Sequence, residues 1–206
     1  MDLGKRINVV IHKKKFVFMM LKKCASVSMG KVILTSLGHK NLKGHNINTV
    51  LRPLGGLSIN EVEELDYTKV AWVRHPLDRL VSGWVHRVKG VSNKNTMTWY
   101  GIPNTISFPD FVDWVCSIND ADMNAHFRQQ TFDLVLDDKL VPNVLMKLET
   151  LHSDWKKLQA QFSWLANLTF HDHKTNKGNW QLSYDKELLK KASKRFSEDL
   201  NLLGYL

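Results

Sequence analysis

Three apolar runs of strand length organise this chain, at Lys15–Leu21, Thr68–Val73 and Val144–Leu148. Each run is short, continuous and followed by a segment with helical spacing, which is typical of strands buried inside a sheet. Strands that alternate with helices favour parallel pairing, because the helices return the chain to the same end of the sheet. The sequence therefore predicts an α/β fold, a three-layer sandwich in which helices flank a central, mostly parallel sheet.

The expected helices carry start signals. Pro76 suits a first helical turn, and apolar residues from Leu77 to Val88 recur at the spacing of one helical face. Ser58 with Glu61 forms a capping-box pattern, and Ser107 with Asp110 forms a similar cap. The other helices are expected at about 28–37, 151–162 and 185–200.

The length of 206 residues predicts a single domain over 1–206 with a substantial core. The cysteines, Cys24 and Cys116, are too few for a disulfide framework and are expected to be free thiols. No apolar run reaches the roughly 18 residues of a membrane span, and the first run is bracketed by lysines. We therefore expect a chain without a signal peptide or membrane anchor.

The formal net charge is +9, from 29 Lys and Arg against 20 Asp and Glu. Such a charge favours polyanionic partners, which include nucleotides, acidic glycans and nucleic acids. A solvated basic face would give the same count, so charge alone does not choose among these partners.

The segment from Lys22 to Gly30 lies between an expected strand and an expected helix. Successive backbone N–H groups and the helix dipole can hold a phosphate there, and a lysine with Ser26 or Ser28 can add contacts. The pattern G-x-x-x-x-G-K-[ST] is absent, so this is not the loop of nucleotide triphosphatases. An ordinary basic strand end with a serine-rich helix start is the alternative.

A second candidate site follows the run that ends at Val73. Arg74 ends this strand and Ser82 follows eight residues later, off the apolar stripe of the next helix. A guanidinium offers a planar fork for phosphate oxygens, and a hydroxyl adds a donor. Arg74 could instead make a structural ion pair, and Arg79 is expected to make one.

These two segments resemble the phosphate-binding motifs of the carbohydrate sulfotransferases of the heparan and chondroitin type, sulfotransferase family 2. The first resembles the pattern P-K-x-A-S-T-S, with Lys22 for the usual Pro and Val27 for a usual Thr. The second resembles V-R-x-P-x-x-R-L-x-S in residue type and spacing. Weaker resemblances extend over most of the chain, at 124–130 (N-A-H-F-R-Q-Q), 147–151 (K-L-E-T-L) and 199–205 (D-L-N-L-L-G-Y).

The resemblance implies a transferase that moves a sulfuryl group from 3′-phosphoadenosine 5′-phosphosulfate (PAPS) to a hydroxyl of a carbohydrate or similar acceptor, with no metal. Lys23 would neutralise the leaving oxygen, and Arg74 with Ser82 would hold the 3′-phosphate. Lys177 is a further candidate for a contact with the nucleotide. The 5′-phosphate loop comprises Lys23, Cys24, Ala25, Ser26, Val27 and Ser28.

A general base must take the proton of the acceptor, and histidine is the usual choice near neutral pH. In the family the base often lies between the two phosphate motifs, which indicates His45 or His39. His126 is the third candidate, because its neighbours resemble a family element. The choice among the three stays open, with His45 slightly ahead.

Two other functions compete with this interpretation. A P-loop-like kinase would use the same strand, loop and helix, but would need magnesium ligands that the sequence lacks. A basic module that binds glycan or nucleic acid without catalysis would show a steep salt dependence. We expect an enzyme that binds no nucleic acid and lies in the cytoplasm of a bacterial or viral system; its oligomeric state is left open.

Overall fold

The computed structural model describes residues 7–42, 46–90, 97, 98, 100–167 and 179–206. The chain divides into two compact units. The first, here called the sheet unit, comprises Arg6–Arg74 and Asp133–His173. The second, the helical unit, comprises Met1–Lys5, His75–Phe132 and Lys174–Leu206.

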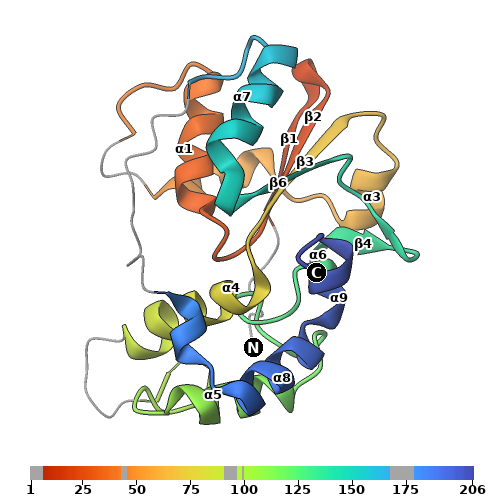
Figure 1. Cartoon of the computed structure of the whole chain (residues 1–206). Coiled ribbons are helices and arrows are strands. Elements are labelled where there is room, and N and C mark those ends of the chain that lie inside the picture. Colours follow the sequence, from red (N-terminus) through yellow and green to blue (C-terminus); the bar gives the residue numbers. More distant parts are fainter. Residues whose placement is uncertain (1–6, 43–45, 91–96, 99, 168–178) are drawn as a thin grey trace. The chain divides into compact units, whose positions relative to one another are not determined.

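A four-stranded sheet forms the centre of the sheet unit, in the order β1-β2-β3-β6 (Figure 1). Its strands are β1 (Ile7–Ile11), β2 (Phe16–Met20), β3 (Thr68–Val73) and β6 (Val144–Lys147). The last three pair in parallel, which confirms the mixed α/β class and the three expected strands. β1 pairs antiparallel with β2 and was not expected. Its run is short, and Asn8 interrupts the apolar pattern.

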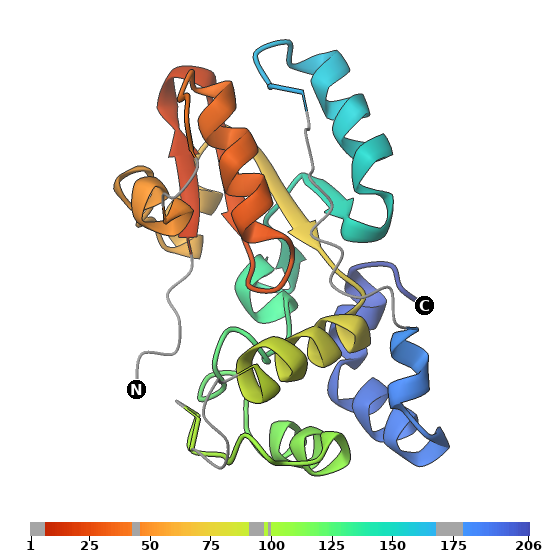
Figure 2. The same ribbon diagram turned by 90° about the vertical axis from the view of Figure 1, so that its left-hand side faces the viewer.

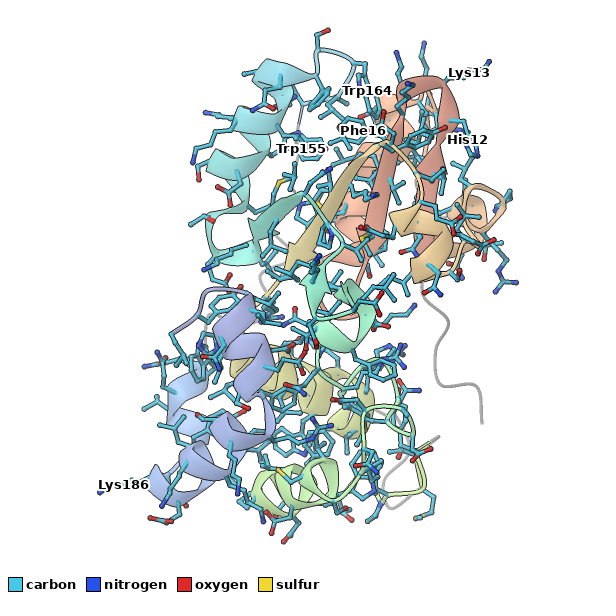
Figure 3. All side chains as sticks on the ribbon, turned by 90° about the vertical axis from the view of Figure 1, so that its right-hand side faces the viewer. His12, Lys13, Phe16, Trp155, Trp164 and Lys186 are labelled. Carbon is cyan, nitrogen blue, oxygen red and sulfur yellow. The ribbon has the colours of Figure 1, made fainter. Side chains whose placement is uncertain are left out.

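One face of this sheet is aromatic. Phe18 stacks on Trp72 with ring centroids 5.5 Å apart, and Trp72 meets Trp155 at 5.8 Å. Trp155 belongs to α7 (Leu151–Gln161), so this helix covers the face. Phe16 contacts Trp164 edge to face at 5.2 Å, and Figure 3 labels both rings. These rings account for the apolar residues that the strands direct to this face.

Helices lie on both faces of this sheet. α1 (Ser26–Ser36) lies on the same face as α7, and the backbone N–H of Ala166 donates to the Ser36 hydroxyl at 2.7 Å (Figures 1 and 2). On the opposite face, Lys69 Nζ donates to the Glu63 carbonyl oxygen at 2.9 Å, next to α3 (Ile59–Glu63). The expected capping box at the start of α3 is present.

Gly30 permits close packing inside the sheet unit. A Cβ atom at this position would lie 2.5 Å from Cγ2 of Ile47 and 2.7 Å from Cδ1 of Leu51, both in α2 (Ile47–Leu51). Such distances are shorter than van der Waals contact, so α2 can approach α1 only because residue 30 is glycine. Gly30, the last residue of the candidate phosphate segment, is therefore required for packing.

We expect Gly30→Ala to lower the free energy of unfolding by about 1–2 kcal/mol, because overpacking outweighs the better helix propensity of alanine. Urea unfolding followed by circular dichroism measures this change. In an Ile47→Ala background, which removes Cγ2, the penalty should shrink. A penalty unaffected by that background would show that the contact with α2 is not its cause.

The helical unit begins with α4 (Pro76–Gly83), which continues as a π-helical segment over Trp84–Lys89. The sequence predicted one regular helix through Val88, and the wider π turn is a difference from it. α5 (Phe108–Cys116) starts as expected, with the Ser107 side chain accepting from Asp110 N. The closing helix is divided at Phe196 into α8 (Lys186–Arg195) and α9 (Ser197–Leu202).

Arg79 is buried in the helical unit, with 1% of its surface exposed. Its guanidinium donates to the carbonyl oxygens of Arg128 and Ala125, both at 2.7 Å. These contacts are with backbone carbonyls, whereas the sequence predicted an ion pair for Arg79. These bonds fix the segment around His126 against α4.

The remaining elements are short. They comprise α6 (Thr131–Leu134), a hairpin of β4 (Val135–Leu136) with β5 (Lys139–Leu140), and the 3-10 turns His12–Lys14, Arg52–Leu54, Leu148–Thr150 and Trp180–Ser183. The β4–β5 hairpin was not expected, because two-residue strands carry too little sequence pattern to detect.

Candidate functional site

The two sequence motifs follow neighbouring parallel strands. β2 and β3 are in register with Phe18 opposite Val70 and Met19 opposite Ala71, so both strands end at the same edge of the sheet. Arg74 comes directly after β3, and Lys23 lies in the loop that follows the end of β2 at Met20. Open α/β sheets bind ligands outside the carboxyl ends of their strands, so this edge is the candidate site.

The loop before α1 has an uncommon backbone. Lys23 and Ala25 take left-handed conformations, with φ angles of 66° and 54°, although neither is glycine. Such residues cost free energy, of the order of 1 kcal/mol each, and cluster at functional sites. Alternation between left-handed and other residues turns successive N–H groups toward one side and forms a concave anion site. The conformation therefore suits the predicted phosphate loop.

The start of α1 adds further donors. Helix N-termini leave several N–H groups without partners inside the helix, and Ala25 at the N-cap supplies no side-chain acceptor. Ser26 and Ser28 are half-buried in the first turn, and neither hydroxyl makes a hydrogen bond within the described residues. Cys24 is buried and Val27 is exposed, so Cys24 and Val27 can serve the loop mainly through their backbone.

Arg74 reaches the loop directly. Its Nη1 donates to the carbonyl oxygen of Lys23 at 3.5 Å, at the outer limit of a hydrogen bond. Residues 51 positions apart in the chain thus meet at one edge of the sheet unit. This contact brings the first motif and the arginine of the second motif together.

Ser82 belongs to α4 in the helical unit. Its side chain is 6% exposed, and its hydroxyl oxygen has no hydrogen-bond partner in the described part of the chain. A buried hydroxyl without a partner costs free energy, which a bound anion would recover. Its role in the 3′-phosphate site stays a prediction from the spacing of the motif.

The three histidine candidates for the general base differ in where they lie. His45, like Lys177, lies outside the described residues. His39 is exposed and follows the last turn of α1, where its N–H donates to the Leu34 carbonyl oxygen at 3.0 Å. An 11-residue helix is about 16 Å long, and the phosphate loop lies at its other end. The structure does not bring His39 to the loop.

His126 is buried in the helical unit, with both ring nitrogens engaged. Nδ1 lies 2.6 Å from Asn124 Oδ1, and Nε2 lies 2.8 Å from Arg87 Nη2. Since a guanidinium can only donate, Nε2 accepts and Nδ1 carries the proton. His126 could act as a base only after its bond to Arg87 breaks.

Lys147 was not among the predicted site residues. It is the last residue of β6 and stands opposite Val73 in the register, so it lies at the same edge as Arg74, which follows β3. Its N–H donates to Asp154 Oδ2 at 3.4 Å. The available signal was a lysine within the third apolar run.

Among the described residues there is neither a candidate metal site nor a helix that could span a membrane. No group of three or more His, Cys, Asp and Glu side chains there could hold a metal ion. Within the same residues, no helix has the length and apolar character needed to cross a membrane.

Taken together, the parallel sheet and the anion-type loop at its carboxyl edge have the features of an α/β protein that binds a phosphate-like group. The chain belongs to the sulfotransferase family: the family model described as "Sulfotransferase family" matches residues 8–206. This match includes both candidate motifs and both units. No curated protein and no solved structure matches the chain. Members of the family transfer a sulfuryl group to an acceptor.

Proposed function

We propose that the protein transfers a sulfuryl group from PAPS to a hydroxyl of a carbohydrate. The observation that carries the proposal is the contact of Arg74 with the Lys23 carbonyl oxygen, because it unites two motifs at a sheet edge suited to ligands. The family match supports the transfer chemistry. The P-loop-like fold, the donor and the class of acceptor are our inferences.

The residues of the two motifs suit a nucleotide with two phosphate groups. In the sheet unit, the loop N–H groups with Ser26 and Ser28 suit a phosphate at the start of α1, and Arg74 offers a charged fork for a second phosphate. Ser82, in the helical unit, has a buried hydroxyl, and the spacing of the motif assigns it to the same phosphate as Arg74. PAPS would supply the sulfuryl group. The residues of the protein would bind the nucleotide, stabilise the charge that develops and accept the acceptor's proton.

In the proposed reaction the acceptor oxygen forms a bond to sulfur while the bond between sulfur and the leaving phosphate oxygen breaks. Negative charge develops on that phosphate oxygen, and the Lys23 ammonium group would stabilise it. The acceptor loses its proton to a base. We retain His45 as the first candidate, since His39 lies away from the loop and His126 donates and accepts elsewhere. The product is adenosine 3′,5′-bisphosphate.

Binding of adenosine 3′,5′-bisphosphate tests the donor site. The nucleotide should stabilise the wild-type protein by about 2.7 kcal/mol at 100 times its Kd, seen as a higher Tm. Arg74→Ala should abolish most of this shift, because a charge-assisted fork is lost. The control is Arg52→Ala, which removes an exposed arginine of the same unit and should keep the shift. A wild-type protein indifferent to the nucleotide would refute the proposal.

Transfer assays separate the competing functions. With labelled PAPS, a screen of sugars and other hydroxyl compounds identifies the acceptor, and neutral sugars without product would argue against a carbohydrate. A kinase would transfer phosphate from ATP and would need magnesium. A basic binding module would show no turnover and an affinity that falls steeply with salt.

A further inference from the structure

Two aromatic rings contact the imidazole of His75, the residue that precedes α4. The His75 imidazole lies 4.4 Å from the Trp180 ring at an interplanar angle of 31°. The Tyr205 ring meets the same imidazole at 5.1 Å and 70°, an edge-to-face contact. Segments more than 100 positions apart in the sequence therefore converge on one side chain. We call His75, Trp180 and Tyr205 the ring clamp.

The clamp acts on the start of α4. His75 is the N-cap residue, and its carbonyl oxygen accepts the first helical hydrogen bond, from Arg79 N at 2.9 Å. The His75 side chain makes no capping bond, so its ring is turned to the clamp. Pro76 at the next position limits the backbone further. The position of the ring and the direction of the helix are thus linked.

A second contact holds the same turn. The Tyr184 hydroxyl donates to the Leu77 carbonyl oxygen at 3.0 Å. Burial raises the pKa of Tyr184, so the hydroxyl keeps its proton and remains a donor. Trp180 also meets the Tyr184 ring edge to face at 6.0 Å. Trp180 and Tyr184 therefore hold the start of α4 through contacts with His75 and Leu77.

The other end of α4 is fixed by packing. A Cβ atom on Gly83 would lie 3.0 Å from the Phe127 ring, so the helix rests closely on that side chain. Ser82, one residue earlier, has the buried hydroxyl described above. A helix held at both ends keeps this hydroxyl in one place, which is what a preorganised anion contact requires.

We propose that His75, Trp180 and Tyr205 are positioning residues that set the affinity for the donor nucleotide through α4 without touching the reacting atoms. This inference rests on the proposed function, because it assigns Ser82 to the 3′-phosphate. The proposal predicts that substitution of these three residues weakens binding of the donor nucleotide and leaves turnover close to the wild-type value.

Trp180→Ala should raise the KM for PAPS and the Kd for adenosine 3′,5′-bisphosphate by about ten-fold, since the stacked contact that holds His75 at the start of α4 is lost. The kcat and the KM for the acceptor should stay close to wild-type values. Trp180→Phe keeps a flat ring and should restore most of the affinity. Calorimetry and steady-state kinetics measure these quantities, and Tyr205→Ala should give a smaller loss of the same kind.

Trp164→Ala is the control, because Trp164 is a half-buried ring of the sheet unit that packs on Phe16 and Phe18. It should lower Tm as Trp180→Ala does but leave the nucleotide Kd unchanged. Equal nucleotide affinity in Trp180→Ala and the wild type would overturn the clamp, and so would an equal loss of affinity in Trp164→Ala. A wild-type protein that does not bind the nucleotide would overturn the proposed function and the clamp together.

Discussion

Lys23→Ala should lower kcat by about two to three orders of magnitude, the cost of removing one group that stabilises charge in a transition state. Lys23 follows the end of β2 in the loop before α1, where its ammonium group can meet an anion held by the loop. The Kd for adenosine 3′,5′-bisphosphate should change by less than about ten-fold, because the backbone N–H groups remain. Single-turnover assays with labelled PAPS and calorimetry with the product nucleotide separate the two effects.

The design of this variant depends on the backbone. Residue 23 has a φ angle of 66°, which glycine would adopt more easily than any other residue. Alanine keeps a Cβ atom and so keeps the strain of the loop, whereas glycine would change both the charge and the strain. Lys22→Ala is the matched control, and it should retain most of the turnover. Equal losses of kcat and nucleotide affinity in Lys23→Ala would show that Lys23 serves to bind the nucleotide and not to stabilise the transition state.

Much of the fold could be predicted because its determinants are local. The strand Thr68–Val73 was found at its observed bounds, and the Ser58 and Ser107 caps act at short range. β1 could not be predicted, since an antiparallel edge strand with an asparagine has no distinctive pattern. The break at Phe196 could not be predicted either, because the apolar spacing continues across it.

The candidate site was predictable only in part, for a different reason. The motifs identified the loop and Arg74, and parallel pairing brings them to one edge. The left-handed angles at Lys23 and Ala25 have no sequence signal, because glycine is the residue expected there. The choice of base depends on which histidine nitrogens are already bonded. At His126 both ring nitrogens are bonded, one to Arg87 and one to Asn124, and these contacts arise from tertiary packing.

Asp199→Ala should destabilise the protein by about 3–5 kcal/mol, because buried donors left without an acceptor each cost about 1–3 kcal/mol. Asp199 is fully buried in α9 and accepts three hydrogen bonds. Oδ2 accepts from Gln130 N at 2.9 Å and Gln130 Nε2 at 3.2 Å, and Oδ1 accepts from Thr131 N at 2.8 Å. These bonds join the C-terminal helix to the segment that resembles a family element. Urea unfolding at pH 7 measures the loss.

Asp185→Ala provides the comparison, since Asp185 is an exposed N-cap whose side chain accepts from Leu188 N at 2.8 Å. Loss of this cap should lower the free energy of unfolding by only about 1 kcal/mol. A smaller loss in Asp199→Ala than in Asp185→Ala would contradict the role of the buried carboxylate. The effect of pH gives a second test. Burial raises the pKa of Asp199, against the lowering effect of the Gln130 and Thr131 N–H groups and of the Arg79 charge.

Because this pKa is higher in the folded protein than in the unfolded chain, the contribution of Asp199 to stability is complete below the unfolded pKa. It declines as pH rises through the folded value, where burial of the charged form begins to cost free energy. The difference in unfolding free energy between the wild type and Asp199→Asn, which stays neutral, should therefore shrink from acid toward neutral pH. A difference that grows with pH would mean that the three donors outweigh burial, and that the charged carboxylate is the form the fold prefers.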